Sequence, residues 1–270
     1  MQTVEIVENE SEFNVPSTDI PLWKSLVAEL IGTFFLVFIG AGAAALTFEQ
    51  GGSIVGTGFA FGLVLMVLIQ ILGEYSGANY NPAVSLGLAI SGRMDWSVMV
   101  AYWIVQFIGG IAAAALIMYF LPGSNDGASI GILTNTDQWK AVLVEMFATF
   151  FLVISVLIIT RNKGVSAGAA IGLVLAFDIM AIGYLTGGSM NPARSLGPAI
   201  FSNNLDTFWI YLLGPLLGAL LAAVVYRIYT YNFNCCYKVD ECGNQIYDEC
   251  DNPIKICKLP MYNKCGNQNM

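Results

Sequence analysis

Two short apolar segments, each opened by the same tripeptide, constrain this chain more than any other feature. Asn81-Pro82-Ala83 and Asn191-Pro192-Ala193 lie 110 positions apart, and each begins a run of about ten mostly apolar residues. A bilayer core of roughly 30 Å requires about 20 helical residues, so neither run spans it. Asparagine caps helices and proline fits their first position, which predicts that each tripeptide starts a half-length helix. Two unrelated helix caps in loops are the alternative, but the equal spacing favours a pore where the half-helices meet.

Hydropathy assigns the chain to a membrane. Apolar residues make up 56% of its 270 positions and charged residues 11%, so the chain is more apolar and less charged than ordinary soluble domains. Histidine is absent and the net charge is −8, so we predict no enzyme, no metal site, no cofactor and no nucleic-acid partner. Six further apolar segments are long enough to span, at about 22–48, 53–72, 96–121, 139–160, 165–185 and 207–229.

Positive charges near the ends of these segments predict the orientation. Only Lys140 flanks one side, and Arg194 lies within the second short segment. The acidic first 20 residues lack the apolar stretch of a cleavable signal peptide. We therefore expect both termini in the cytoplasm, in a plasma membrane or an internal vesicle membrane. This cytoplasmic side, opposite the one that Lys140 flanks, carries the remaining flanking charges, Lys24, Arg93, Arg161, Lys163 and Arg227.

The chain is also an internal duplication. Glu29-Leu-Ile-Gly-Thr33-Phe-Phe-Leu-Val37 returns as Glu145-Met-Phe-Ala-Thr149-Phe-Phe-Leu-Val153. Three spans per repeat is an odd number, so the second copy is inverted, and such repeats place the functional site near the bilayer midplane. We predict an all-α membrane protein with six transmembrane helices, two re-entrant half-helices and inverted three-helix repeats. Its parts are an acidic N-terminal tail (1–21), a channel domain (22–230, with repeats at about 22–121 and 139–229) and a cysteine-containing C-terminal tail (231–270).

Over residues of about 22–230 the chain resembles the aquaporin (major intrinsic protein) family. Besides the motifs above, the resemblance rests on Ser76-Gly77-Ala78-Asn79-Tyr80, Gly187-Gly188-Ser189-Met190 and Arg194. The resemblance implies a homotetramer with one pore per subunit, surrounded by membrane lipid. It implies that Glu29, Glu145 and Gln106 support the re-entrant loops, with a proton relay as the alternative for the two glutamates. The outer selectivity filter that it implies consists of Phe61, Ile179, Gly188 and Arg194.

Asn81 and Asn191 offer amide donors to a passing water oxygen, and the positive ends of the two half-helices repel cations, including a hopping proton. Strict water channels of this family resemble each other in having histidine at the position of Ile179, so this constriction is expected to be wider and more apolar. Ser195 and Ala199, by contrast, match water channels rather than glycerol facilitators. We predict a passive channel for single-file water that excludes ions and protons. A broader channel for glycerol, urea or ammonia and an ion-coupled secondary transporter remain the alternatives.

Asp178 does not fit the family pattern. Successive helical residues differ by about 100° in direction, so we expect it to face a neighbouring helix or a subunit interface rather than the pore. A structural acid and a gating or permeation role both remain open. Two Gly-x-x-x-Gly faces, which we expect to pack helices within the fold rather than to mediate dimerisation, are Gly58 with Gly62 and Gly168 with Gly172.

All cysteines lie in the C-terminal tail. No pair has the C-x-x-C spacing of a zinc site, and the cytoplasm expected for this tail is reducing. Cys235 and Cys236 follow the sixth span, where S-acylation is chemically reasonable. Acylation, a metal or disulfide module and free thiols are all left open for the six residues Cys235, Cys236, Cys242, Cys250, Cys257 and Cys265.

Overall fold

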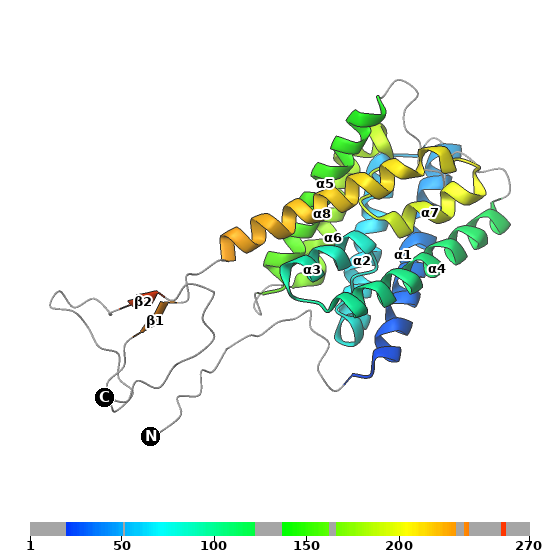
Figure 1. Cartoon of the computed structure of the whole chain (residues 1–270). Coiled ribbons are helices and arrows are strands. Elements are labelled where there is room, and N and C mark those ends of the chain that lie inside the picture. Colours follow the sequence, from blue (N-terminus) through cyan, green and yellow to red (C-terminus); the bar gives the residue numbers. More distant parts are fainter. Residues whose placement is uncertain are drawn as a thin grey trace, which may run out of the picture. The chain divides into compact units, whose positions relative to one another are not determined.

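Six membrane-length helices dominate the structure, a computed structural model that describes residues 20–50, 52–121, 137–161, 166–230, 235–237 and 255–257. Each has at least 20 residues and is apolar enough to cross a bilayer, which confirms the predicted fold class and the number of spans. They are α1 (Leu22–Gln50), α2 (Ile54–Ser76), α4 (Trp96–Phe120), α5 (Gln138–Ile159), α6 (Ala167–Thr186) and α8 (Phe208–Thr230), the last preceded by the short 3₁₀ helix η1 (Leu205–Thr207) (Figure 1).

The end of α2 differs most from the expected boundaries, because the helix continues past residue 72 to Ser76. Its stop is Gly77, which has a left-handed φ of 81° and donates its N–H to the Gly73 carbonyl. Glycine reaches this conformation without steric cost, so the helix ends where the backbone can turn. The extra turn brings the helix directly to the loop before the first tripeptide.

Two half-helices of ten residues each, α3 (Pro82–Ser91) and α7 (Pro192–Phe201), begin at the two tripeptides. Asn81 caps α3 by accepting a hydrogen bond from the Ala83 N–H at 2.8 Å. Asn191 caps α7 by accepting from the Ala193 N–H at 3.0 Å. Proline at the first helical position lacks an N–H that would otherwise need a partner, so each Asn-Pro pair starts its helix from purely local chemistry.

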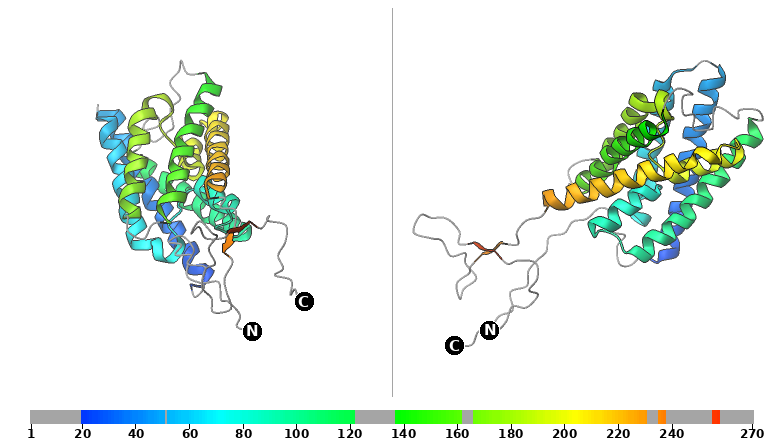
Figure 2. Two further views of the ribbon diagram at one scale, coloured as in Figure 1. Left: turned by 90° about the vertical axis from the view of Figure 1, so that its left-hand side faces the viewer. Right: turned by 45° about the horizontal axis from the view of Figure 1, so that its top comes forward.

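The two repeats pack together through glycines. α2 lies against α6, and Figure 1 shows the shorter α3 and α7 beside the long helix α4, which they contact. Figure 2 shows the same helices from two further sides. A Cβ atom added to Gly62 would collide with the Gly172 carbonyl oxygen, and one added to Gly172 would collide with that of Gly62. The prediction that these glycines pack helices within the fold is therefore confirmed.

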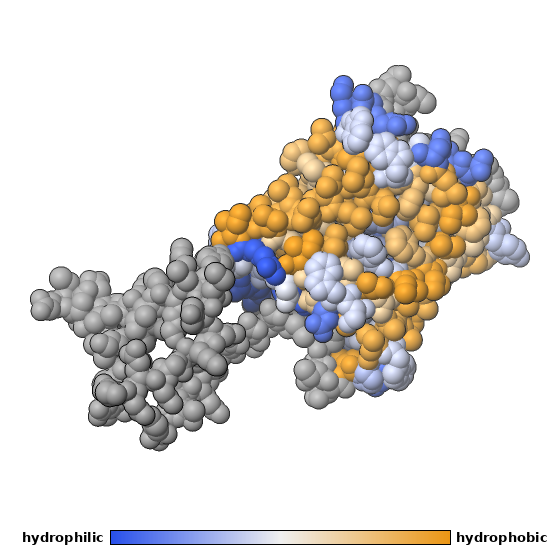
Figure 3. Space-filling model, in the orientation of Figure 1, coloured by the Kyte–Doolittle hydropathy of each residue, from blue (hydrophilic) through white to orange (hydrophobic). Residues whose placement is uncertain are grey.

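The helical body is apolar on its surface and polar at particular places inside. Large apolar side chains such as Phe59, Leu63 and Val67 are more than two-fifths exposed along α2. Figure 3 shows hydrophobic residues over most of this face of the helices, with hydrophilic residues gathered toward the helix ends. Glu29 and Glu145, in contrast, are fully buried. This distribution is the one a bilayer requires, because lipid covers the outside and internal polar groups must find partners within the protein.

A short antiparallel pair of strands, β1 (Cys235–Tyr237) and β2 (Lys255–Cys257), was not predicted from the sequence. Their register pairs Cys235 with Cys257 and Cys236 with Ile256. The strands belong to a unit that is separate from the helical body. The acidic tail expected at residues 1–21 lies almost entirely outside the described residues.

Candidate functional site

The N-termini of α3 and α7 are linked by reciprocal hydrogen bonds. Asn81 Nδ2 donates to the Met190 carbonyl at 2.8 Å, and Asn191 Nδ2 donates to the Tyr80 carbonyl at 2.9 Å. Each amide nitrogen has two N–H groups, and each of these bonds uses one of them. Both asparagines line an internal cavity.

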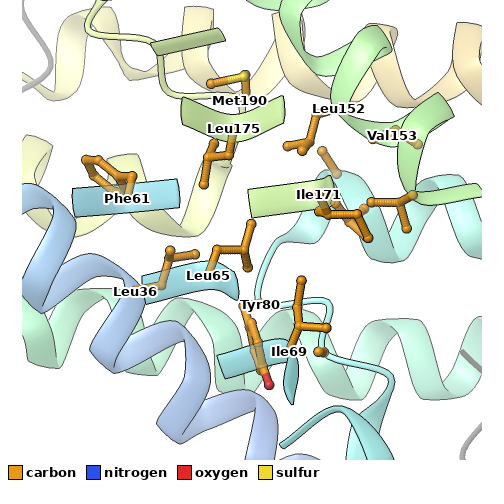
Figure 4. Packing of buried hydrophobic residues seen from close by; sticks show 14 of the residues in the cluster. Leu36, Phe61, Leu65, Ile69, Tyr80, Leu152, Val153, Ile171, Leu175 and Met190 are labelled. Carbon is orange, nitrogen blue, oxygen red and sulfur yellow. The ribbon is translucent and has the colours of Figure 1, made fainter. Parts of the chain in front are cut away.

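The residues that line this cavity include both Thr160 and Arg194. Its polar lining comes from these two residues, the two asparagines and the loop segments that precede the tripeptides. A few polar groups facing an apolar wall hold permeating molecules loosely enough to let them move on. Figure 4 shows the apolar side chains from several helices that point toward one another around this space, among them Leu36, Phe61, Leu65, Leu152, Ile171 and Leu175.

The loops before the tripeptides adopt an unusual backbone. Ala78, Tyr80 and Met190 have φ values of 55°, 50° and 52°, in the left-handed region that non-glycine residues rarely occupy. Such conformations persist where surrounding contacts fix them, and they cluster at functional sites. The carbonyls of Tyr80 and Met190 are those that receive the asparagine amides, so these left-handed residues help to join the starts of the two half-helices.

Glu29 fixes the loop before the first tripeptide (residues 77–80), called the inner loop; its counterpart before the second tripeptide (residues 187–190) is called the outer loop. Its Oε1 accepts from the Ser76 hydroxyl at 2.7 Å and the Asn79 N–H at 2.9 Å. Its Oε2 accepts from the Tyr80 N–H at 2.7 Å and from Gln106 Nε2 at 2.8 Å. All four acceptor positions of the carboxylate are thus occupied, and the structure brings Glu29 and Gln106 together at the loop that the sequence assigned to them.

Glu145 holds the outer loop in the same manner with three donors. Oε1 accepts from the Thr186 hydroxyl at 2.6 Å and the Ser189 N–H at 2.9 Å, and Oε2 accepts from the Met190 N–H at 2.7 Å. A buried carboxylate that accepts two backbone N–H groups fixes the direction of the loop that carries them. The outer loop therefore depends on α5 for its shape.

Two tyrosines that the sequence analysis did not assign to the site also hold these loops. The Tyr102 hydroxyl donates to the Ser76 carbonyl, and the Tyr211 hydroxyl donates to the Thr186 carbonyl, both at 2.9 Å. They occupy equivalent places in the two repeats, 109 positions apart. A search of the duplication for matching aromatic residues would have found them.

The four positions named from the family resemblance form two contacting pairs, of which Phe61 and Arg194 line the cavity and Ile179 and Gly188 do not. The Arg194 guanidinium lies 4.5 Å from the centre of the Phe61 ring, and its Nη2 donates to the Gly187 carbonyl at 3.1 Å. Its Nε and Nη1 have no hydrogen-bond partner among the described residues. On the other side, a Cβ atom at Gly188 would come within 3.1 Å of the Ile179 Cα, so a side chain there would press on the helix.

Arg93, which the sequence marked only as a flanking positive charge, is buried at the end of α3. Its Nη1 donates to the Leu157 carbonyl at 2.9 Å and to the Thr160 hydroxyl at 3.0 Å. A cation at the C-terminus of a helix interacts favourably with the helix dipole. Arg93 thus joins the ends of α3 and α5, next to a residue of the cavity lining.

Asp178 does not belong to the cavity lining. It is 8% exposed, and its Oδ2 has no hydrogen-bond partner among the described residues. No group of three metal-ligating side chains occurs in the part of the chain that the structure describes. Of the tail cysteines, Cys235, Cys236 and Cys257 lie in the two strands, whereas Cys242, Cys250 and Cys265 lie outside the described residues.

The chain is similar to several known membrane proteins. A family model described as "Major intrinsic protein" matches residues 16–226. Nodulin-26 of Glycine max is 37% identical over 84% of this chain and 87% of that protein. The glycerol uptake facilitator protein-like 6 of Lactiplantibacillus plantarum is 39% identical over 76% of this chain and 97% of that protein. The aquaglyceroporin structure from Plasmodium falciparum superposes with a TM-score of 0.69 at 24% identity, over 76% of this chain and 96% of that one, and thus shares the fold.

Proposed function

The chain belongs to the major intrinsic protein family, whose members are membrane channels rather than enzymes, and from this premise we propose that it conducts water and small uncharged solutes passively. The sequence alone favoured water as the conducted molecule. Similarity to a protein named as a glycerol uptake facilitator supports a broader range, of which glycerol is the first candidate.

The composition of the outer constriction carries this proposal. Arg194 provides donors to a passing oxygen, and Phe61 limits the width on its side. Ile179 is fully buried beside Gly188 and contributes only carbon atoms to this level. One polar and one apolar side suit a molecule with hydroxyl groups on one edge and CH groups on the other, as well as water.

Exclusion of ions and protons follows from the centre of the pore. The partly positive N-termini of α3 and α7 converge there, and Asn81 and Asn191 present amide donors. A water oxygen that accepts from both asparagines cannot pass a proton along the file, and a cation is repelled by both helix ends. Amide N–H groups and helix N-termini do not replace the hydration shell of a cation, which requires oxygen ligands.

Stopped-flow light scattering of vesicles that contain the purified chain tests the proposal. Osmotic shrinkage should be faster than in empty vesicles, proportional to the gradient and unaffected by an imposed sodium or proton gradient. Reswelling in glycerol should also be accelerated. Acceleration of water flux without any glycerol flux would restrict the function to water, and flux driven by an ion gradient would indicate a transporter instead.

We also propose that both termini lie on the cytoplasmic side and that four subunits assemble, each with its own pore. The orientation is supported by the gathering of positive charges at one end of the bundle. Arg93 bonds to the end of α5, and the Arg161 guanidinium lies 5.9 Å from the centre of the Tyr226 ring on α8. Positive residues prefer the cytoplasmic side of a membrane.

A further inference from the structure

Tryptophan occurs at five positions, and four of them share one kind of place. Each of these four is the first or second residue of a long helix: Trp23 in α1, Trp96 in α4, Trp139 in α5 and Trp209 in α8. At such positions the indole lies at the membrane–water interface, where its N–H reaches water or lipid headgroups. Trp103 differs, because it is the eighth residue of α4 and lies about 10 Å along the helix from its start.

An indole N–H at this depth needs an acceptor within the protein, because hydrocarbon offers none. Trp103 has its acceptor in the half-helix α3, since its Nε1 donates to the Pro82 carbonyl at 2.9 Å. A helix carbonyl accepts the N–H of the residue four positions on, and its second lone pair can accept the indole as well. Pro82 directly follows Asn81, so this bond acts on the first turn of α3, beside the amide at the midplane.

Two neighbours of Trp103 on α4 hold the same region. The Tyr102 hydroxyl donates to the chain at the end of α2, and Gln106 Nε2 donates to Glu29 and, at 3.1 Å, to the Ser85 hydroxyl. These bonds secure the inner loop and one side chain of α3. The bond from Trp103 acts instead on the backbone of α3, at the residue where the helix begins.

The second repeat lacks this donor. The 109-residue offset between Tyr102 and Tyr211 places Leu212 at the position of Trp103. A leucine side chain has no N–H, so α7 cannot receive the matching bond from α8. Because α7 starts at the same tripeptide and has the same ten residues as α3, the bond is not required for a half-helix to form. Its effect is therefore on where the half-helix is held.

We propose that Trp103 is a positioning residue of the pore centre: its indole N–H fixes the start of α3 and thereby the direction of the Asn81 amide. Asn81 Oδ1 accepts from the Ala83 N–H, so this side chain moves together with the first turn. Its Nδ2, which donates to the Met190 carbonyl, moves with it. The inference rests on the proposed channel function, in which this amide orients the water that interrupts proton transfer. Trp103 then governs proton exclusion, whereas the filter around Arg194 does not depend on it.

Exchange of the indole protons tests the hydrogen bond without any flux. Tryptophan labelled with ¹⁵N in the indole ring should give five N–H signals in the NMR spectrum of the purified full chain. Phenylalanine variants of the four interfacial tryptophans assign their own signals, so the fifth belongs to Trp103. After transfer to D₂O it should exchange at least about tenfold more slowly than the other four, and its proton should resonate downfield of free indole in a hydrocarbon solvent. A fifth signal that exchanges as fast as the interfacial ones, or that lacks the downfield shift, would overturn the inference.

Trp103→Phe removes the N–H and keeps an aromatic ring. Proton leak in vesicles, measured with a pH-sensitive dye and corrected for empty vesicles, should rise by about fivefold, a size that the loss of one hydrogen bond typically gives. The ratio of glycerol to water permeability should stay at the wild-type value, because the outer filter is untouched. Trp96→Phe removes an interfacial indole from the same helix and should leave both quantities unchanged.

An unchanged proton leak in Trp103→Phe would refute the positioning role, and so would a change of the permeability ratio as large as that of the leak, because it would indicate general loosening of the fold. If Trp103→Phe does not fold, the exchange and the shift of the wild-type indole decide the matter. If the chain passes water but no glycerol, the proposed solute range fails, whereas proton leak and indole exchange still test Trp103.

Discussion

Arg194 presents two guanidinium nitrogens to the outer constriction that have no hydrogen-bond partner among the described residues. Arg194→Val would remove these donors, the positive charge and the contact with the Phe61 ring. We expect glycerol flux and the passage of larger polyols to rise by roughly tenfold, which corresponds to about 1.4 kcal/mol of lost barrier. Proton leak should rise as well. Stopped-flow reswelling and a pH-sensitive dye inside the vesicles measure the two effects, with Arg194→Lys as the variant that keeps the charge. An unchanged solute range and proton leak in Arg194→Val would show that the filter lies elsewhere.

Ile179 gives the opposite test at the same level. Ile179→His would add a ring and a hydrogen-bond donor beside Gly188, whose backbone already packs against Ile179. Water flux should remain within a few-fold, while glycerol flux falls by about tenfold because the pore becomes narrower and loses its apolar side. Ile179→Leu, which keeps the apolar volume, should retain both fluxes. Equal glycerol flux in the histidine and leucine variants would contradict the assignment of Ile179 to the filter.

Single residues could be placed from the sequence where their chemistry is local or repeated. Asn81 and Asn191 were recognised because the Asn-Pro pair itself starts a helix, and Glu29 was recognised through its duplicate, Glu145. Arg93 was read only as a positive charge that flanks an apolar segment, because nothing in the sequence shows that its side chain reaches the end of α5. The surroundings of Asp178 likewise depend on the rotation of α6 about its own axis, which only packing determines.

The contact between α2 and α6 predicts a sharp difference between two glycines of one helix. A Cβ at Gly62 would collide with the Gly172 backbone, whereas one at Gly56 would meet nothing within 4 Å. Gly62→Val should therefore destabilise the folded chain by about 1–3 kcal/mol or prevent its folding. Gly56→Val should be close to neutral. Thermal unfolding in detergent, followed by tryptophan fluorescence and by the yield of monodisperse protein, compares the variants. Equal stability of the two would mean that the helices do not pack as closely as the structure indicates.

Helices were easier to predict than the ways in which they end. Apolar length alone identified all six spans. The end of α2 was placed too early because apolar length alone does not mark a helix end, and the helix continues through Gly73 and Glu74 until Gly77 turns the backbone. The strands β1 and β2 gave no recognisable signal, because three residues are too few for an alternating pattern.

For the whole molecule, the proposed assembly predicts four independent pores. Crosslinking in mild detergent should give a ladder that ends at four subunits. When wild type and Arg194→Val are co-expressed, glycerol flux should increase in proportion to the fraction of variant, because each pore lies within one subunit. A steep or threshold-like dependence on that fraction would indicate a pore shared between subunits, and a ladder that stops at the monomer would contradict the assembly.

The crossed bonds between the half-helices have a consequence for biosynthesis. Asn81 and Tyr80 leave the ribosome more than 100 residues before their partners, since the two bonds span 109 and 111 positions. Until the second half of the chain is inserted, the inner loop has its Glu29 anchor but lacks its counterpart across the midplane. The junction of the two half-helices is therefore completed only after the second tripeptide has been synthesised, so the midplane contact forms late in the synthesis of the chain.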